Sequence, residues 1–209
     1  MKKLFLLVCV AVLLFSCKKE EPNPSDPTPK ANYLPLKIGN YWVYQCYHVD
    51  TLGNENLLSR IDSIIVKCDT TIRNNQYYVL ENFTMSGRPY LTFLRDSSGY
   101  IVTETGDIIF SATNFTDVLY FKEIYNGETL LYTLSYKMEK VDKPITVPAG
   151  KFDVLNYKGT AVIRQSDGTN ITKKLNNLYA NNVGKVFYVC HSVTSDYRLE
   201  GRLVRYHVQ

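Results

Sequence analysis

Hydrophobic and polar residues alternate along most of the chain after residue 32. The clearest case lies within residues 129–138, where every second position is apolar: Leu130, Tyr132, Leu134, Tyr136 and Met138. Successive side chains of a β-strand point to opposite faces, so a period of two places such residues on one side. The alternation therefore predicts a strand with one buried face.

Other strand-length segments are rich in aromatic and β-branched residues, which suit a pleated, half-buried surface. They cover residues 41–49, 61–67, 77–80, 90–94, 100–102, 152–163, 171–179, 183–193 and 198–208. No run has helical spacing, apart from a single turn expected near residues 114–120. About ten short strands joined by polar turns predict a mainly β domain over residues 33–209. We expect an antiparallel, strongly curved sheet with little helix, and a closed β-barrel or a sandwich is the alternative.

The first seventeen residues have a different pattern. Lys2 and Lys3 precede an almost unbroken apolar run over residues 4–15, which Ser16 and then Cys17 follow. This order is typical of a bacterial secretory signal, and it resembles lipoprotein signals, whose cysteine is acylated and becomes the first residue of the mature protein. A spanning helix would need about 20 apolar residues. The resemblance implies a signal peptide over residues 1–16 and a lipid on Cys17 that holds the protein to a membrane.

Residues 17–32 contain the anchor and a tether in which four of the eight prolines lie. Proline fixes φ and removes a backbone donor, so the segment is expected to be an extended spacer. Its start, Lys18-Lys19-Glu20-Glu21, resembles the surface-export signal of Bacteroidota lipoproteins. That resemblance implies an outer-membrane lipoprotein facing the cell surface, with the periplasmic face as the alternative.

The composition excludes some classes of partner. The formal net charge is +4, but two of the lysines belong to the signal, so the remaining chain is nearly balanced. A nucleic-acid-binding protein needs a concentrated basic face to neutralise phosphates. We therefore expect no nucleic-acid partner.

Candidate catalytic and metal-ligating residues are scattered. The three histidines, His48, His191 and His207, lie in no metalloprotease motif, and the chain has no nucleophile elbow or phosphate-binding loop. We therefore predict a non-enzymatic protein without a cofactor. Cys46, His48 and Cys190 are ligand types that zinc accepts, but a disulfide or buried thiols explain the cysteines better, and we predict no metal. One disulfide with a spare thiol and three thiols both remain open for Cys46, Cys68 and Cys190.

Three segments resemble a large group of bacterial lipoprotein domains of unknown function. They are YLPLKIGNYWVY at residues 33–44, VPAGKFDV at residues 147–154 and YANNVGKV at residues 179–186. Domains of that group are similar in fold to the LolA/LolB half-barrels, which implies an open curved sheet with an apolar concave face. In the third segment, Gly184 is expected at a bulge or a sharp bend.

These observations predict a lipid-anchored envelope protein that binds a lipid or another hydrophobic ligand in its concave sheet by burial of apolar area. Large aromatic side chains would line the site, and the candidates are Trp42, Tyr44, Tyr132, Tyr136 and Phe152. For Trp42, anchoring of the core is the simpler role. The alternative function is a surface-exposed binding or structural module that recognises a glycan or a protein partner.

Overall fold

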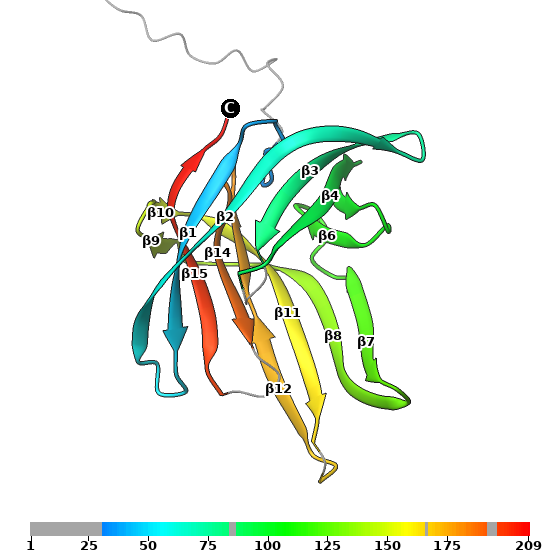
Figure 1. Ribbon diagram of the computed structural model, residues 1–209, viewed down its shortest axis with the longest axis vertical. Coiled ribbons are helices and arrows are strands. Elements are labelled where there is room, and N and C mark those ends of the chain that lie inside the picture. Colours follow the sequence, from blue (N-terminus) through cyan, green and yellow to red (C-terminus); the bar gives the residue numbers. More distant parts are fainter. Residues whose placement is uncertain (1–30, 84–86, 166, 192–195) are drawn as a thin grey trace, which may run out of the picture. The chain divides into compact units, whose positions relative to one another are not determined.

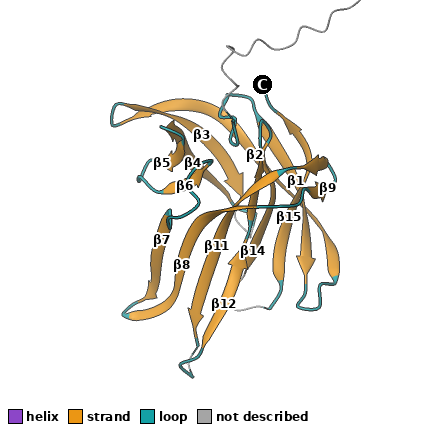
Figure 2. Ribbon diagram, turned by 180° about the vertical axis from the view of Figure 1, so that it is seen from behind, coloured by secondary structure: helices purple, strands orange, loops and turns teal. Residues whose placement is uncertain are grey.

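The structure is a computed structural model that describes residues 31–83, 87–165, 167–191 and 196–209. The signal peptide, Cys17 and nearly all of the tether lie outside these residues. The described chain consists of strands and loops (Figure 2). None of its segments is a helix that could cross a bilayer.

Fifteen strands follow one another along the chain. In order they are β1 Tyr41–Val49, β2 Glu55–Ile72, β3 Asn75–Phe83, β4 Pro89–Ser97, β5 Tyr100–Thr103, β6 Ile108–Ser111, β7 Tyr120–Asn126, β8 Thr129–Lys140, β9 Ile145–Val147, β10 Gly150–Phe152, β11 Val154–Arg164, β12 Asn170–Leu175, β13 Asn177–Ala180, β14 Gly184–His191 and β15 Arg198–His207.

Thirteen of the strands form one antiparallel sheet. Its order is β6-β5-β4-β3-β2-β1-β15-β14-β13-β11-β8-β7, with β12 paired to β11, while β9 and β10 form a separate hairpin. The sheet curls until its two edge strands, β6 and β7, come near each other (Figure 1). The predicted antiparallel, strongly curved sheet is therefore confirmed, and its curvature brings it close to a closed barrel with one unsealed seam.

Some elements differ from those that the alternation predicts. The second strand extends over Glu55–Ile72, and the expected strand at residues 171–179 is divided into β12 and β13. The short edge strands β6 and β7 were not expected. An edge strand pairs on one side only, and β7 is mostly exposed. A strand with no buried face needs no regular alternation of apolar and polar residues, and this alternation is the sequence signal for a strand.

The pairing of β1 with β15 joins the two ends of the domain. It runs from Tyr41 opposite His207 to Val49 opposite Arg198. The buried side chain of Asn40 lies beside this pair of strands. Its Nδ2 donates to the carbonyl of Pro35 at 2.9 Å, and its Oδ1 accepts from the backbone N–H of Gln209 at 3.1 Å. One polar side chain thus ties the entering chain to the C-terminus.

One end of the barrel interior is filled by the protein's own side chains. Trp42 is only 1% exposed, its indole N–H donates to the carbonyl of Val183, and Gly184 lies against the indole. The rings of Phe110 and Tyr179 pack 4.8 Å apart. These residues belong to a single hydrophobic cluster that also includes Tyr44, Leu80, Leu94, Met138, Val154, Val186 and Leu203.

A hydrogen bond crosses the interior toward the seam. The hydroxyl of Tyr157 on β11 donates to the backbone carbonyl of Ile108 on the edge strand β6 at 2.8 Å. The Tyr157 ring stacks on Tyr136 of β8, with centroids 4.6 Å apart. Side chains therefore connect the two sides of the seam where backbone pairing stops.

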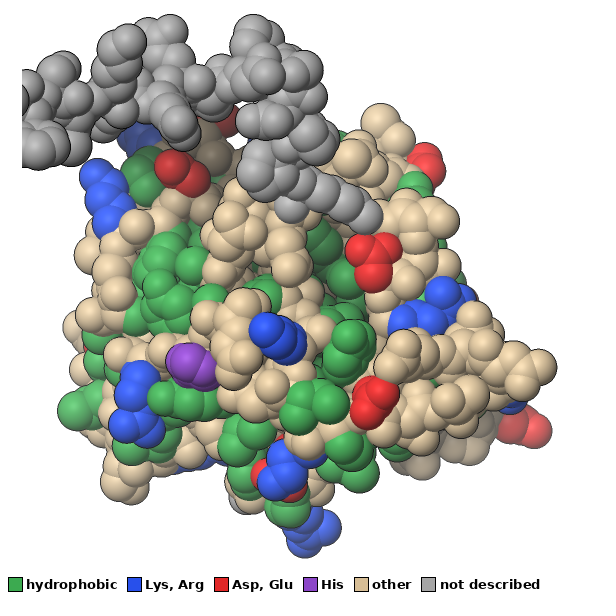
Figure 3. Space-filling model, turned by 90° about the horizontal axis from the view of Figure 1, so that it is seen from above, with side chains coloured by type: hydrophobic (Ala, Val, Ile, Leu, Met, Phe, Trp, Pro, Cys, Tyr) green, Lys and Arg blue, Asp and Glu red, His purple; other side chains and the backbone are tan. Residues whose placement is uncertain are grey.

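Charged residues are dispersed over the end of the barrel at which the C-terminus lies. In this view, lysine and arginine side chains stand at separate places, and acidic side chains lie between them (Figure 3). The visible described residues of this face form no continuous basic surface of the kind that neutralises a nucleic-acid backbone.

Replacing Gly184 with alanine tests the packing of Trp42. Gly184 has φ +103°, and a Cβ there would lie 2.8 Å from the indole nitrogen of Trp42. Gly53 has φ +85° with nothing within 4 Å, so Gly53→Ala measures the backbone cost alone. We expect Gly53→Ala to lower the free energy of unfolding by about 1–2 kcal/mol. Gly184→Ala should lose about 1–3 kcal/mol more through overpacking. Urea denaturation measures both, and equal losses would contradict the packing described.

Candidate binding pocket inside the barrel

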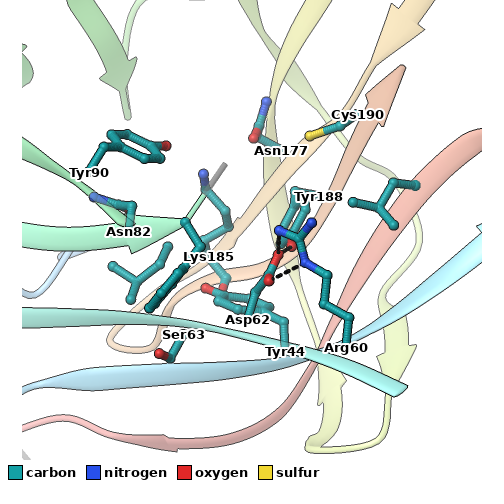
Figure 4. Close-up of a pocket in the computed structure, with 13 residues that line it drawn as sticks. Tyr44, Arg60, Asp62, Ser63, Asn82, Tyr90, Asn177, Lys185, Tyr188 and Cys190 are labelled. Carbon is teal, nitrogen blue, oxygen red and sulfur yellow. Dashed lines mark hydrogen bonds and ion pairs between the residues drawn. The ribbon is translucent and has the colours of Figure 1, made fainter. Parts of the chain in front are cut away.

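The barrel interior contains a pocket with a volume of about 200 Å³ (Figure 4). The strands around it, β4, β3, β2, β1, β15, β14 and β13, are consecutive neighbours in the sheet. Its lining consists of Tyr44, Arg60, Asp62, Ser63, Ile64, Asn82, Phe83, Tyr90, Asn177, Lys185, Tyr188, Cys190 and Leu199. The first and last strands of the domain thus contribute to the same wall.

A buried carboxylate lies on one side of the pocket. Asp62 is 7% exposed and forms a two-pronged ion pair with Arg60, with N–O distances of 2.6 and 2.8 Å. The hydroxyl of Tyr188 donates to Asp62 Oδ2 at 2.6 Å. A charge in a protein interior is costly unless it is paired and hydrogen-bonded. These three residues meet that requirement with charge-assisted hydrogen bonds.

The inward face of β2 carries two charged residues among apolar ones. Arg60 and Asp62 line the pocket, whereas Ile61 and Leu57 are 62% and 60% exposed. Ile64 and Val66 lie on the same inward face, so Arg60 and Asp62 interrupt a row of apolar side chains. Local violations of the hydrophobic pattern are expected at functional sites. The two charged residues on the inward face of β2 therefore identify this wall as the candidate functional surface.

A β-bulge brings Lys185 into the pocket. Leu178 of β13 pairs with Phe187 and the next residue, Tyr179, pairs with Lys185, so Val186 has no partner in this register. Residues three apart in a regular strand point to opposite faces. Because of the extra residue, Lys185 and Tyr188 line the same pocket.

The Lys185 ammonium contacts aromatic rings. Its Nζ lies 5.5 Å from the ring centroid of Tyr179 and 6.0 Å from that of Tyr188. Burial favours a lower pKa for Lys185, but the nearby Tyr179, Tyr90 and Cys190 outweigh it, and the pKa lies above its ordinary value. The side chain is therefore a cation at neutral pH. No carboxylate in the described part of the chain forms an ion pair with it.

The cysteines near the pocket are thiols. Cys46, Cys68 and Cys190 are all free, with Cys46 buried, Cys190 partly buried and Cys68 exposed. Burial, together with the negative charge of Asp62, raises the pKa of Cys46 to about 11. His48 packs against Tyr197 with the two rings tilted and their centroids 3.7 Å apart, and it does not line the pocket. The described residues contain no cluster of His, Cys, Asp and Glu that could hold a metal ion.

The five aromatic residues predicted to line a ligand site are not brought together. Tyr44 lines the pocket, and its hydroxyl donates to the backbone carbonyl of Lys185 at 2.9 Å. Trp42 belongs to the filled end, and Tyr136 packs on that core. Phe152 lies near Tyr206, with centroids 6.4 Å apart. Tyr132 lines a separate depression along β8 and β11.

The pattern of large aromatic residues does not identify the polar part of the lining. The residues missed are Arg60, Asp62, Asn82, Asn177, Lys185 and Tyr188. A sequence signal existed for one of them, because Asp62 stands between Ile61 and the apolar run Ile64-Ile65-Val66. The bulge at Val186 has no comparable signal, since it depends on how β14 meets β13.

Comparisons with known proteins relate the chain to solved structures alone. No family model matches it, and no curated protein matches it. It is similar to the crystal structure of a candidate lipoprotein from Parabacteroides distasonis ATCC 8503. The TM-score is 0.52 at 18% identity, over 85% of this chain and 99% of that one. It also resembles the crystal structure of a candidate exported protein with a YmcC-like fold from Bacteroides fragilis NCTC 9343. There the TM-score is 0.49 at 17% identity, over 85% of this chain and 99% of that one. At 18% identity, the first similarity establishes a shared fold.

Thiol reactivity tests the burial of Cys46. A raised pKa keeps Cys46 protonated, and only the thiolate is a nucleophile. We expect iodoacetamide at about pH 8 to modify the exposed Cys68 and to leave Cys46 unmodified, as read by peptide mass spectrometry. Unfolded protein, in which all three thiols should react, is the control. Equal labelling of Cys46 and Cys68 in the folded protein would be incompatible with the buried position of Cys46.

Proposed function

We propose that this protein is a lipid-anchored, non-enzymatic component of the bacterial cell envelope that binds a small ligand inside its barrel. The observation that carries the proposal is the interior pocket, where charged and polar side chains of a mainly apolar barrel converge. Asp62 and Arg60 occupy positions that a purely structural core would give to apolar residues. A concave pocket with a few converging polar groups is the usual form of a ligand site.

The space inside the barrel limits the size of this ligand. The filled end, with Trp42, Phe110 and Tyr179, leaves a volume of about 200 Å³. An apolar cavity of about 150 Å³ holds benzene, and drug-sized ligands occupy about 300–1,000 Å³. Ile64, Phe83 and Leu199 provide apolar wall beside the polar groups. These dimensions favour a compact, partly apolar molecule over a long-chain lipid.

The N-terminal sequence supports the location that we propose. The signal-like residues 1–16 and the cysteine at position 17 favour acylation, and Lys18-Lys19-Glu20-Glu21 favours the outer face of the outer membrane. The structural relative from Parabacteroides distasonis is described as a candidate lipoprotein. A likeness to the LolA/LolB half-barrels would fit the same picture of an anchored barrel with a ligand inside.

Analysis of the purified full chain tests ligand binding. We expect denaturation of protein isolated from its native membrane to release a compact molecule in about equimolar amount, detected by mass spectrometry, because a pocket of this size accommodates one such molecule. Matched protein expressed in a heterologous host and dialysed extensively is the control, and it should lose the compound.

Absence of any released compound, together with no shift of the melting temperature by small aromatic probes, would reject the binding function. In that case, recovery of an outer-membrane complex or a glycan with the intact protein would favour the alternative, a surface recognition module.

Labelling with radioactive palmitate tests the anchor. Wild-type protein should incorporate the label and Cys17→Ala should not, since the acylated cysteine is the attachment point implied by the signal. Surface biotinylation of whole cells then tests the orientation, with alanine replacing each of residues 18–21 as the comparison. Equal incorporation of label by Cys17→Ala and wild type would refute lipidation at this residue. Equal biotinylation of the wild type and the variant with alanine at residues 18–21 would refute the export role of the charged segment.

A further inference from the structure

The geometry points to a carboxylate-bearing ligand: we propose that Lys185 binds the anionic group of a compact organic monoanion inside the barrel. This inference rests on the proposed binding function and specifies its ligand class. It concerns one residue, Lys185, whose ammonium faces the pocket beside Tyr179 and Tyr188.

The charges of the pocket lining do not cancel. Its charged side chains are Arg60, Asp62 and Lys185. Arg60 and Asp62 neutralise each other through the two contacts of 2.6 and 2.8 Å. Lys185 forms no ion pair with a carboxylate of the described residues. The lining therefore has one uncompensated positive charge.

Aromatic contacts satisfy this cation only in part. A cation removed from water loses hydration, and interaction with the faces of Tyr179 and Tyr188 at 5.5 and 6.0 Å recovers a fraction of it. An anion placed beside the ammonium would supply the missing counter-charge within the low-dielectric interior, where such pairing is stronger than in water. The bulge at Val186, which turns Lys185 inward, thus creates the site.

The surroundings favour a single negative charge on the ligand. Lys185 supplies one positive charge, so a dianion such as a phosphate monoester would keep one uncompensated negative charge inside the barrel. Arg60 is already engaged with Asp62, so it is not a second cation for such a group. One ammonium beside apolar walls of Ile64, Phe83 and Leu199 fits a carboxylate attached to a small ring or a short aliphatic group.

Benzoate and benzamide form a matched pair of probes, because they have nearly the same shape and differ in charge. We expect the wild-type full chain, reconstituted in nanodiscs, to bind benzoate about tenfold more tightly than benzamide in isothermal titration calorimetry. Because the pair would form inside the barrel, added salt should reduce this preference only slightly. This comparison needs no variant, so the proposal is testable even if substitutions impair folding.

Lys185→Met assigns the effect to one residue. Methionine keeps an unbranched apolar side chain and removes the charge, so the preference for benzoate should disappear while benzamide binding stays near the wild-type value. Lys151→Met, at an exposed position on β10, is the control and should keep the preference. Lys185→Arg retains a cation and should keep part of it.

The outcomes separate this inference from the binding function. Equal affinities of wild type for the two probes, or an unchanged benzoate preference in Lys185→Met, would overturn the role of Lys185 and leave the binding function standing. If neither probe binds at millimolar concentration and no compound is released from the native protein, the binding function fails and this inference fails with it.

Discussion

The antiparallel pairing of β1 with β15 is the contact on which the rest of the structure depends. It joins the first strand of the chain to the last. Strands β2 to β6 lie on one side of this pair, and β14, β13, β11, β8 and β7 lie on the other, so the pairing unites them in one sheet. Trp42 and Val183, 141 residues apart in the chain, meet only because of this pairing. Closing so long a loop costs conformational entropy before any contact forms. Burial of Trp42 and Tyr44 on β1 provides much of the compensation, since both side chains are almost completely removed from water.

The interior is divided into a packed half and a polar half. At the packed end, aromatic rings interlock around Trp42 and Tyr179, and the hydroxyl of Tyr157 reaches the backbone of β6 across the seam. Toward the pocket, Asp62, Arg60 and Tyr188 replace apolar contacts with a hydrogen-bonded network. The packed end provides stability, which allows the other half to accept buried polar groups that contribute less to it. A scaffold of this kind can hold a binding group rigidly, because each strand around the pocket is hydrogen-bonded to a neighbour on both sides.

The uncompensated charge of Lys185 makes the polar half of the interior selective for anions. An interior with one excess cation attracts anions even when no ligand is bound. The apolar wall around the cation restricts which anions fit. The tether and acylated cysteine that we propose would hold such a pocket at a membrane surface, where a membrane-bound receptor meets small molecules of its surroundings. Binding at this site would require no catalytic group, in agreement with the lack of recognisable catalytic motifs in the sequence.

The sequence by itself determined the fold class, because composition and alternation are local properties. β8 lies where the period of two predicts a strand, and β1 lies where the run of aromatic and β-branched residues predicts one. The sequence predicts a bulge or a sharp bend at Gly184; this glycine begins β14 with φ +103° and lies against Trp42, whereas the bulge itself lies at Val186. The tertiary structure alone decided which face of β2 points inward, because Ile61 and Asp62 are equally compatible with either face until neighbouring strands pair. It also decided that Lys185 and Tyr188 share a pocket. Strand register depends on contacts between residues far apart in the chain, and a shift of one residue reverses every side chain.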